Sequence, residues 1–358
     1  MPLHDVGYRP WQGTPGRGGG PRVIAATGIR LAWKSRWLRR VLLFAWSPAI
    51  MFAGGFFAFE QALEEGAIGA GRVLSQRLDG FGLIGGLVAD SLGGSLDDPE
   101  AARRIVWSRL LLAFMRAPQA VLLAVVVGLV APRLIAGDLR AKAWLVYFTR
   151  PVSRGDYILG KVLVLATIVS LITLLPALVL WMLGVLVSPS LAVAAATWDL
   201  PLRILAAAAA VTIPTVLLAL AYSSLTTESR IAAFAWFATW VACWITHGAL
   251  SGADLAARER PRAKAAVQDP FDDTAAPVAQ PRASGPRLGW LARAAGIDGT
   301  EDRWAWLSLF HAQGVVQGWI FGIGTRWPAV LPSLVSLAVV AAVSLVVLFL
   351  RVDAPARA

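Results

Sequence analysis

Residues 134–162 read LIAGDLRAKAWLVYFTRPVSRGDYILGKV. This charged stretch separates two apolar runs, each of which is long enough to cross a membrane. Asp138 stands where the N-cap of a short helix over residues 139–148 is expected. Pro151 ends that helix, because the residue before a proline is pushed out of the α region. The stretch therefore predicts a short helix followed by a sharp break.

A second helix is predicted to open directly after the break. Ser153 and Asp156 have the spacing of a capping box, in which each side chain bonds the backbone of the other residue. The apolar run at residues 158–187 then forms the interior of this helix, with Lys161 near its start. The pattern predicts a capped membrane-spanning helix.

Residues 155–161, GDYILGK, match the start of the phosphate-binding loop G-x-x-x-x-G-K-[ST]. Val162 replaces the hydroxyl that would hold Mg²⁺, and a predicted membrane helix follows directly. We therefore expect that this chain binds no nucleotide or metal cofactor and is no ATPase. ATP and Mg²⁺ would then belong to a separate subunit.

The composition indicates an integral membrane protein. Of the 358 residues, 57% are hydrophobic and 15% are charged, whereas a soluble domain averages about 25% charged residues. The net charge of +11 arises mainly from basic residues beside apolar runs, which is typical of membrane orientation and not of nucleic-acid binding. One cysteine, Cys243, excludes a disulfide within the chain.

The apolar runs predict an all-α, polytopic protein with six membrane-spanning helices, and both termini are expected in the cytoplasm because arginines precede the first span and glutamates follow it. The predicted spans are residues 41–59, 118–135, 158–187, 201–220, 231–250 and 328–350. The segments between and around them are a disordered N-terminus (1–21), external loops (61–117 and 251–327), a cytoplasmic connector (136–157) and a cytoplasmic tail (351–358).

Three of these segments have further structure in the prediction. Residues 22–40 form an amphipathic helix that lies in the lipid headgroups, or else serve only as a basic flank of the first span. Residues 61–117 form an external cap on the bilayer surface, with a helix that starts at Asp98 and Pro99. Residues 304–327 form an interfacial or re-entrant segment, because glycines interrupt the apolar run, and the stretch before them is flexible. The alternative is a full span, which would place the C-terminus outside.

The pattern consists of an acidic residue and a basic helix, followed by Arg150-Pro151, Ser153-Arg154, Tyr157 and Gly160-Lys161. This order resembles the type-2 ABC transporter permease family. The resemblance covers the connector and is supported elsewhere by the topology. It implies a permease subunit of an ATP-driven exporter in the cytoplasmic membrane of a bacterium. It also implies a separate ATP-binding cassette subunit, a second permease copy, and an N-terminal elbow helix in contact with membrane lipid.

In that family the connector carries a coupling helix that docks on the ATP-binding subunit. The apolar residues of such a helix would press into a groove of the partner, and its basic residues would fix the orientation. The alternative is an amphipathic connector that lies on the inner leaflet. The predicted coupling residues are Asp138, Arg140, Lys142, Trp144, Leu145, Tyr147, Phe148, Arg150, Pro151, Ser153 and Arg154.

Other classes of function find less support. The predicted spans hold almost no ionisable side chain in their interiors, which argues against an ion-coupled carrier. Trp236, Trp240 and Trp244 form a stripe at spacing four, which would line a substrate path or merely supply packing bulk. No nucleophile–base pair is evident, so an enzyme is not expected. A membrane-anchored scaffold without transport activity is the alternative to a permease.

Overall fold

The computed structural model describes residues 19–64, 99–143, 152–268, 303–323 and 326–353. All regular structure in these residues is helical, which confirms the predicted all-α class. Six helices are long and apolar enough to cross a membrane, and this confirms the predicted number of spans. They are Arg36–Gln61, Glu100–Arg140, Arg154–Val187, Asp199–Leu225, Ser229–Asp254 and Trp327–Val352.

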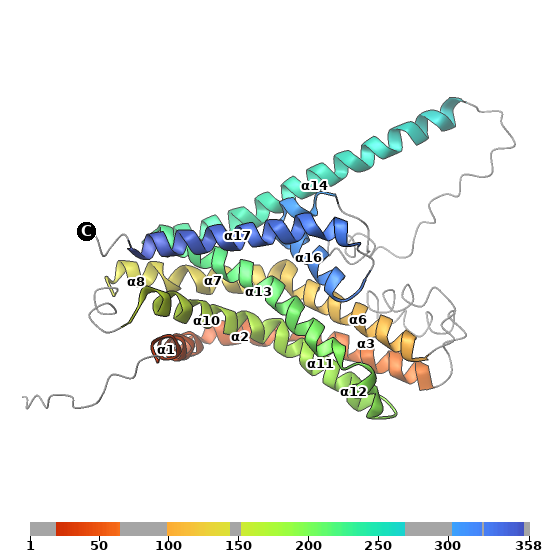
Figure 1. Ribbon diagram of the computed structural model, residues 1–358, viewed down its shortest axis with the longest axis horizontal. Helices are drawn as coiled ribbons and strands as arrows, with labels where there is room; N and C mark the ends of the chain where they lie inside the picture. The colour runs from red at the N-terminus through yellow and green to blue at the C-terminus, as the bar shows by residue number, and fades with distance from the viewer. Residues whose placement is uncertain (1–18, 65–98, 144–151, 269–302, 324–325, 354–358) are drawn as a thin grey trace, which may run out of the picture.

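The elements in chain order are α1 (Gly20–Lys34), α2 (Arg36–Ala45), α3 (Ser47–Glu64), α6 (Pro99–Pro118), η3 (Gln119–Leu123), α7 (Ala124–Leu134), α8 (Ala136–Arg140), α10 (Arg154–Ile172), α11 (Leu174–Val187), α12 (Ala192–Ala196), α13 (Asp199–Leu225), α14 (Ser229–Gln268), η4 (Ala305–Leu307), α16 (Leu309–Ile320) and α17 (Trp327–Asp353). The long helices run side by side in one elongated bundle (Figure 1). We call its two extremities the α8 end and the α12 end.

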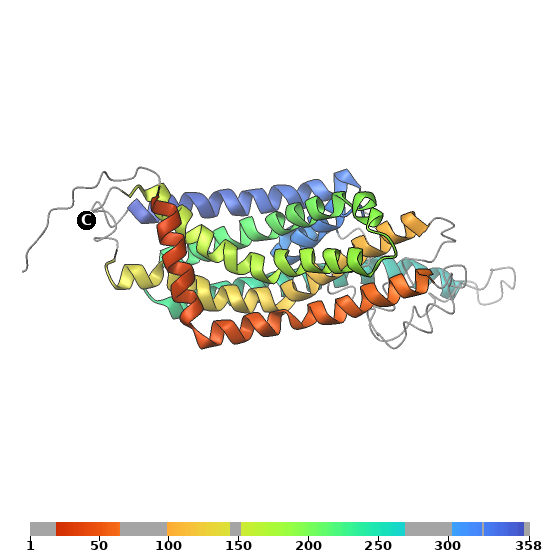
Figure 2. The same cartoon turned by 90° about the horizontal axis from the view of Figure 1, so that it is seen from below.

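Helix α1 lies across the bundle at the α8 end, where it packs against α10 (Figure 2). Close approach is possible because each helix offers a glycine to the other. A Cβ added to Gly28 would lie 2.5 Å from the side chain of Val164, and one added to Gly160 would lie 2.7 Å from Ile24. The helix predicted over residues 22–40 divides at Ser35, whose hydroxyl accepts from the backbone N–H of Leu38 at 3.3 Å and so caps α2.

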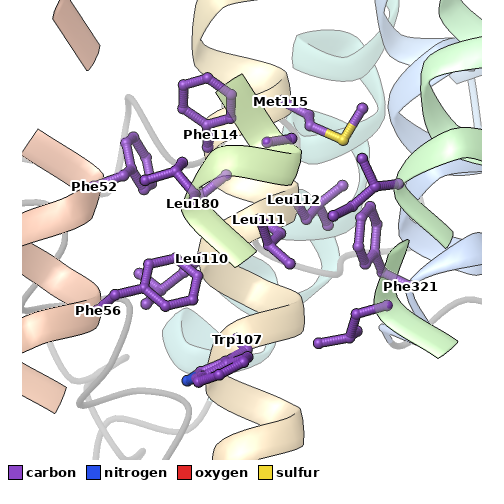
Figure 3. Close-up of a cluster of buried hydrophobic side chains, with 14 of the residues drawn as sticks. Phe52, Phe56, Trp107, Leu110, Leu111, Leu112, Phe114, Met115, Leu180 and Phe321 are labelled. Carbon is purple, nitrogen blue, oxygen red and sulfur yellow. The ribbon is translucent and has the colours of Figure 1, made fainter. Parts of the chain in front are cut away.

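Helix α6 differs from the prediction of an external cap over residues 61–117. It begins at Pro99, close to the predicted start, but it packs against α3 and α11 inside the bundle. Figure 3 shows Phe52 and Phe56 of α3 and Leu180 of α11 facing Trp107 and its neighbours on α6. Side chains 110–115 of α6 are at most 2% exposed. Because residues 110–115 are apolar on every side of the helix, burial in the bundle removes more of their surface from water than a place on the bilayer would.

The third predicted span is broken in the middle. The helix stops at Thr173 between α10 and α11, three residues before Pro176. A proline lacks the N–H that would bond the carbonyl four residues earlier, so the ladder is interrupted at this turn. The fifth predicted span, residues 231–250, continues as α14 to Gln268, although the sequence predicts a flexible segment from residue 251.

Helix α16 occupies the segment predicted to be interfacial or re-entrant. Its 12 residues extend about 18 Å, which is short of the roughly 30 Å of a hydrocarbon core. It packs among α6, α13, α14 and α17, and Phe310, Gln313 and Gln317 are fully buried. The segment is therefore a short helix inserted into the bundle and not one that rests at its surface.

Candidate coupling site

The helix α7 is interrupted at Ile135, and a hydroxyl from another helix enters the break. Ser223 of α13 accepts from the backbone N–H of Ile135 at 3.2 Å and of Ala136 at 3.0 Å. The same hydroxyl donates to the carbonyl of Pro132 at 3.1 Å. In an unbroken helix the N–H of Ala136 would bond the carbonyl of Pro132 directly. Ser223 is thus inserted in the hydrogen-bond ladder, where it bends the chain from α7 into α8.

The carboxylate of Asp138 binds α8 to α10. Its Oδ2 atom lies 2.6 Å from Nζ of Lys161 and accepts from the Tyr157 hydroxyl at 2.8 Å. Tyr157 and Lys161 are one turn apart on α10, so both face α8 from the same side. The Lys161 side chain is 10% exposed and that of Asp138 is 22% exposed. Charge-assisted hydrogen bonds between partly buried groups such as these are stronger than the same bonds in water.

The predicted N-cap role of Asp138 is wrong. Ile135 occupies the cap position of α8, and Asp138 lies in the first helical turn. Its carboxylate is engaged by Lys161 and Tyr157 of another helix rather than by the backbone of its own. A long-range ion pair has outweighed the local cap.

A third contact joins α8 to the junction between α13 and α14. Arg140 Nη2 lies 2.6 Å from Oε2 of Glu228, and both side chains are more than half exposed. Glu228 is itself positioned by the hydroxyl of Thr226, which accepts from its backbone N–H at 3.0 Å. Helix α8 is therefore tied to α10, to α13, and to the start of α14.

The predicted helix over residues 139–148 is wrong at residues 141–143. Helix α8 ends at Arg140, and residues 141–143 form a turn in which Lys142 has φ 51°. A positive φ is the left-handed conformation, which cannot continue a right-handed helix. Lys142 is exposed at this turn. Six predicted coupling residues lie outside the described part of the chain: Trp144, Leu145, Tyr147, Phe148, Arg150 and Pro151.

The capping box at the start of α10 is confirmed. Ser153 Oγ accepts from the backbone N–H of Asp156 at 3.1 Å, and Asp156 Oδ2 accepts from that of Ser153 at 3.0 Å. Arg154 is the first helical residue. The GDYILGK sequence is wound into this helix, where Lys161 is paired with Asp138, so it forms no phosphate-binding loop.

The tryptophan stripe packs α14 onto the bundle. Trp236 is 1% exposed, and its indole N–H donates to the carbonyl of Ala124 at 2.8 Å. Trp240 is 6% exposed and meets Trp236 edge-to-face, while Trp244 is 39% exposed and tilts over Phe310. These contacts favour the packing interpretation for Trp236 and Trp240, and a substrate path along the stripe stays a prediction.

Ionisable groups inside the bundle were not predicted from the sequence. Glu60 and Arg103 form a buried ion pair, and Arg116 of α6 is fully buried with Nη1 donating to the carbonyl of Phe310 at 2.7 Å. The predicted near-absence of ionisable side chains from the spans is therefore wrong. The signal was present in the apolar run that extends from residue 105 through residue 135, because Arg109 and Arg116 are its only charges before Arg133.

The comparison with protein families identifies the chain. A model of the family described as ABC-2 family transporter protein matches residues 37–354, which include all six candidate spans except the first residue of the first one. A search of curated proteins finds no match. The chain is therefore a multi-pass membrane protein that belongs to the ABC-2 transporter family.

Proposed function

We propose that the chain is the permease subunit of an ABC exporter and that a separate ATP-binding subunit docks on residues 136–157. The attachment of α8 to three helices is the observation that carries the proposal. A connector that merely joined two spans would need no such attachment. A surface that receives force from a partner needs firm contact with the helices that are to move.

Each contact of α8 supplies a route for that force. Asp138 and Lys161 connect α8 to α10, and Ser223 connects it to α13. Arg140 and Glu228 connect it to the start of α14. Because helices transmit displacement along their length, a small tilt of α8 would become a motion at the α12 end.

The remaining parts of the proposal follow from the family. The α8 end would face the cytoplasm, α1 would be the interfacial elbow helix in contact with lipid, and two permease copies would pair in the membrane of a bacterium. The partner subunit would hold ATP and Mg²⁺ and hydrolyse the nucleotide. Arg140 and Lys142 are exposed at the α8 end, where they would orient that partner. The direction of transport is proposed from the family resemblance.

A distance measurement on the assembled complex tests this route without knowledge of the cargo. Cys243 is the sole cysteine, so Cys243→Ser gives a background for two spin labels at Leu191 and Gly252, which are exposed near the α12 end. With ATP and Mg²⁺ we expect the distance between the labels to shift. Lys161→Met should abolish the shift while the complex still forms, and Arg230→Gln, an exposed basic residue outside the contacts described above, should leave it intact. An unchanged shift in Lys161→Met would remove the coupling role of the α8–α10 contact.

A further inference from the structure

Helices α13 and α16 face each other through a row of polar contacts that begins near the α12 end. Nη1 of Arg203 lies 3.3 Å from the carbonyl oxygen of Ile320, in the last turn of α16. One turn further along α13, Nε2 of Gln317 lies 3.5 Å from the carbonyl oxygen of Ala207. A cation beside the final carbonyls of a helix is favourable, so Arg203 fixes that end of α16.

The row continues toward the middle of the bundle. Nε2 of Gln313 donates to the hydroxyl of Thr215 at 2.8 Å and lies 3.4 Å from the carbonyl oxygen of Val211. The α13 partners thus recur every fourth residue, as do the two glutamines of α16. Spacing of four keeps all of these groups on one face of each helix, so they line a single seam.

Two oxygen atoms along this seam have no hydrogen-bond donor among the described residues. They are Oε1 of Gln313 and Oε1 of Gln317, and each atom is buried. Both glutamines are fully buried residues. A buried acceptor without a donor is destabilising in an apolar interior, and a side chain such as methionine would avoid this penalty. Buried polar groups of this kind in a native protein call for an explanation.

We propose that the α13–α16 seam binds the headgroup of an amphipathic cargo and that this headgroup carries neutral hydroxyl groups, as a sugar does. The hydroxyls donate to the unpaired oxygens when α16 separates from α13, and the apolar tail stays among the membrane helices. That the bound molecule is transported rests on the proposed function, whereas the presence of a binding site at this seam does not. The tryptophan stripe on α14 is not part of this site.

The charges beside the seam exclude other headgroups. The guanidinium of Arg203 lies at one extremity of the row, where it is paired with Asp199 at 3.0 Å. The guanidinium of Arg116 lies against α16 at Gly314, where an added Cβ would be 2.3 Å from Cζ. The Arg116 guanidinium repels a cationic headgroup. A bare carboxylate offers only acceptors to the amide oxygens. A hydroxyl donates to the amide oxygens and carries no charge, so it suits both features.

The two glutamines separate binding from simple packing between helices. Gln313 makes a short bond to Thr215, so its loss would weaken the α13–α16 contact in either case. The bond from Gln317 to the Ala207 carbonyl is 3.5 Å long, at the limit for a hydrogen bond, so it contributes little to the contact between the helices. If the seam only joins the helices, Gln317→Met has no consequence. If the seam binds a headgroup, Gln317→Met weakens binding while the fold is kept.

Photolabelling of the full-length protein in phosphatidylcholine nanodiscs tests the proposal. One probe is octyl glucoside with a diazirine in its tail, and the other is octyltrimethylammonium with the same tail and no N–H or O–H group. The variants are Gln313→Met and Gln317→Met. The control is Ser336→Ala, which removes the bond from that hydroxyl to the Trp306 carbonyl, outside the seam. Labelled peptides and the thermal midpoint of each variant are measured together.

We expect the glucoside probe to label α13 or α16 and the ammonium probe to label neither above background. Each glutamine variant should lower glucoside labelling about two- to tenfold, which corresponds to one hydrogen bond. Gln317→Met should melt at or above the wild-type temperature, and Ser336→Ala should label as the wild type does. Equal labelling of wild type and Gln317→Met, equal labelling by both probes, or no label on these helices would overturn the proposal. Because labelling needs no ATP-binding subunit, the result stays readable even if the coupling proposal fails.

Discussion

Two ion pairs at opposite ends of the bundle are built differently. At the α12 end, the guanidinium of Arg103 makes two parallel bonds of 2.9 Å to the two carboxylate oxygens of Glu60, and the Trp107 indole adds a third at 3.1 Å. The Glu60 side chain is 1% exposed. At the α8 end, Asp138 meets Lys161 through a single oxygen and is 22% exposed.

The difference in geometry indicates a difference in role. A bidentate guanidinium–carboxylate pair has a fixed orientation, and breaking it inside a protein leaves a buried charge alone. Such a pair holds α3 and α6 together as one unit. A lysine ammonium is a point charge on a flexible stem, so it keeps its attraction to Asp138 over a range of positions. The α8 end can therefore change shape while staying connected, whereas α3 and α6 move together as one unit.

Glu60→Ala should have the largest effect on stability. It leaves the Arg103 guanidinium buried without its carboxylate, so we expect a loss of about 3–5 kcal/mol in the free energy of unfolding. Denaturation in mild detergent measures the loss. The double variant Glu60→Met with Arg103→Met removes both charges and should be more stable than Glu60→Ala. Equal instability of the two variants would contradict the account of this pair.

Asp138→Asn should lower stability less but abolish coupling. The partly exposed pair with Lys161 contributes about 1–3 kcal/mol at most, because solvent screens it. The ATP-driven distance shift at the α12 end should nevertheless disappear. Exchange of the two residues, Asp138→Lys with Lys161→Asp, should restore part of the shift. A wild-type shift in Asp138→Asn would mean that this contact transmits no motion.

Ser223→Ala tests the hydroxyl in the helix ladder. The N–H groups of Ile135 and Ala136 lose their acceptor, with an expected cost of about 1–2 kcal/mol. Hydrogen exchange at these two amides should accelerate, and Ser223→Thr, which keeps a hydroxyl, should protect them again. Unchanged exchange in Ser223→Ala would show that the bend between α7 and α8 does not depend on Ser223.

Arg140→Ala should have the smallest effect on the fold. Its pair with Glu228 is more than half exposed on both sides, and exposed pairs contribute about 0–1 kcal/mol. We expect an unchanged melting temperature together with weaker binding of the ATP-binding subunit at low salt, and this difference from the wild type should shrink as salt is raised. A clear drop in melting temperature would show that this contact holds the bundle rather than the partner.

Local signals in the sequence predicted much of this structure. The apolar runs predict six spans, and the spacing of Ser153 and Asp156 predicts the capping box, because both depend on residues that are close in the chain. The coupling role of the connector stays a prediction. Asp138 was singled out from the sequence as an N-cap, but in the structure it lies in the first turn of α8 and pairs with Lys161.

Long-range contacts account for what the sequence analysis missed. Asp138 pairs with a residue 23 positions away, and Ser223 reaches residues 87 and 88 positions away, so no local rule predicts either bond. Arg116 was assigned to the predicted external cap, because the arginines of that helix were interpreted as exposed to solvent. In the structure the backbone carbonyl of Phe310, 194 positions away, accepts a hydrogen bond from Arg116 and makes its burial possible.

Isolation of the tagged protein from its native membrane tests the central claim most directly. Mild detergent should retain a subunit with an ATP-binding cassette and measurable ATP hydrolysis beside the wild-type chain. The variant Trp144→Glu with Phe148→Glu should insert normally in the membrane but lose that subunit. Retention of the ATP-binding subunit by the variant, or its absence beside the wild type, would contradict the claim that residues 136–157 couple this permease to ATP.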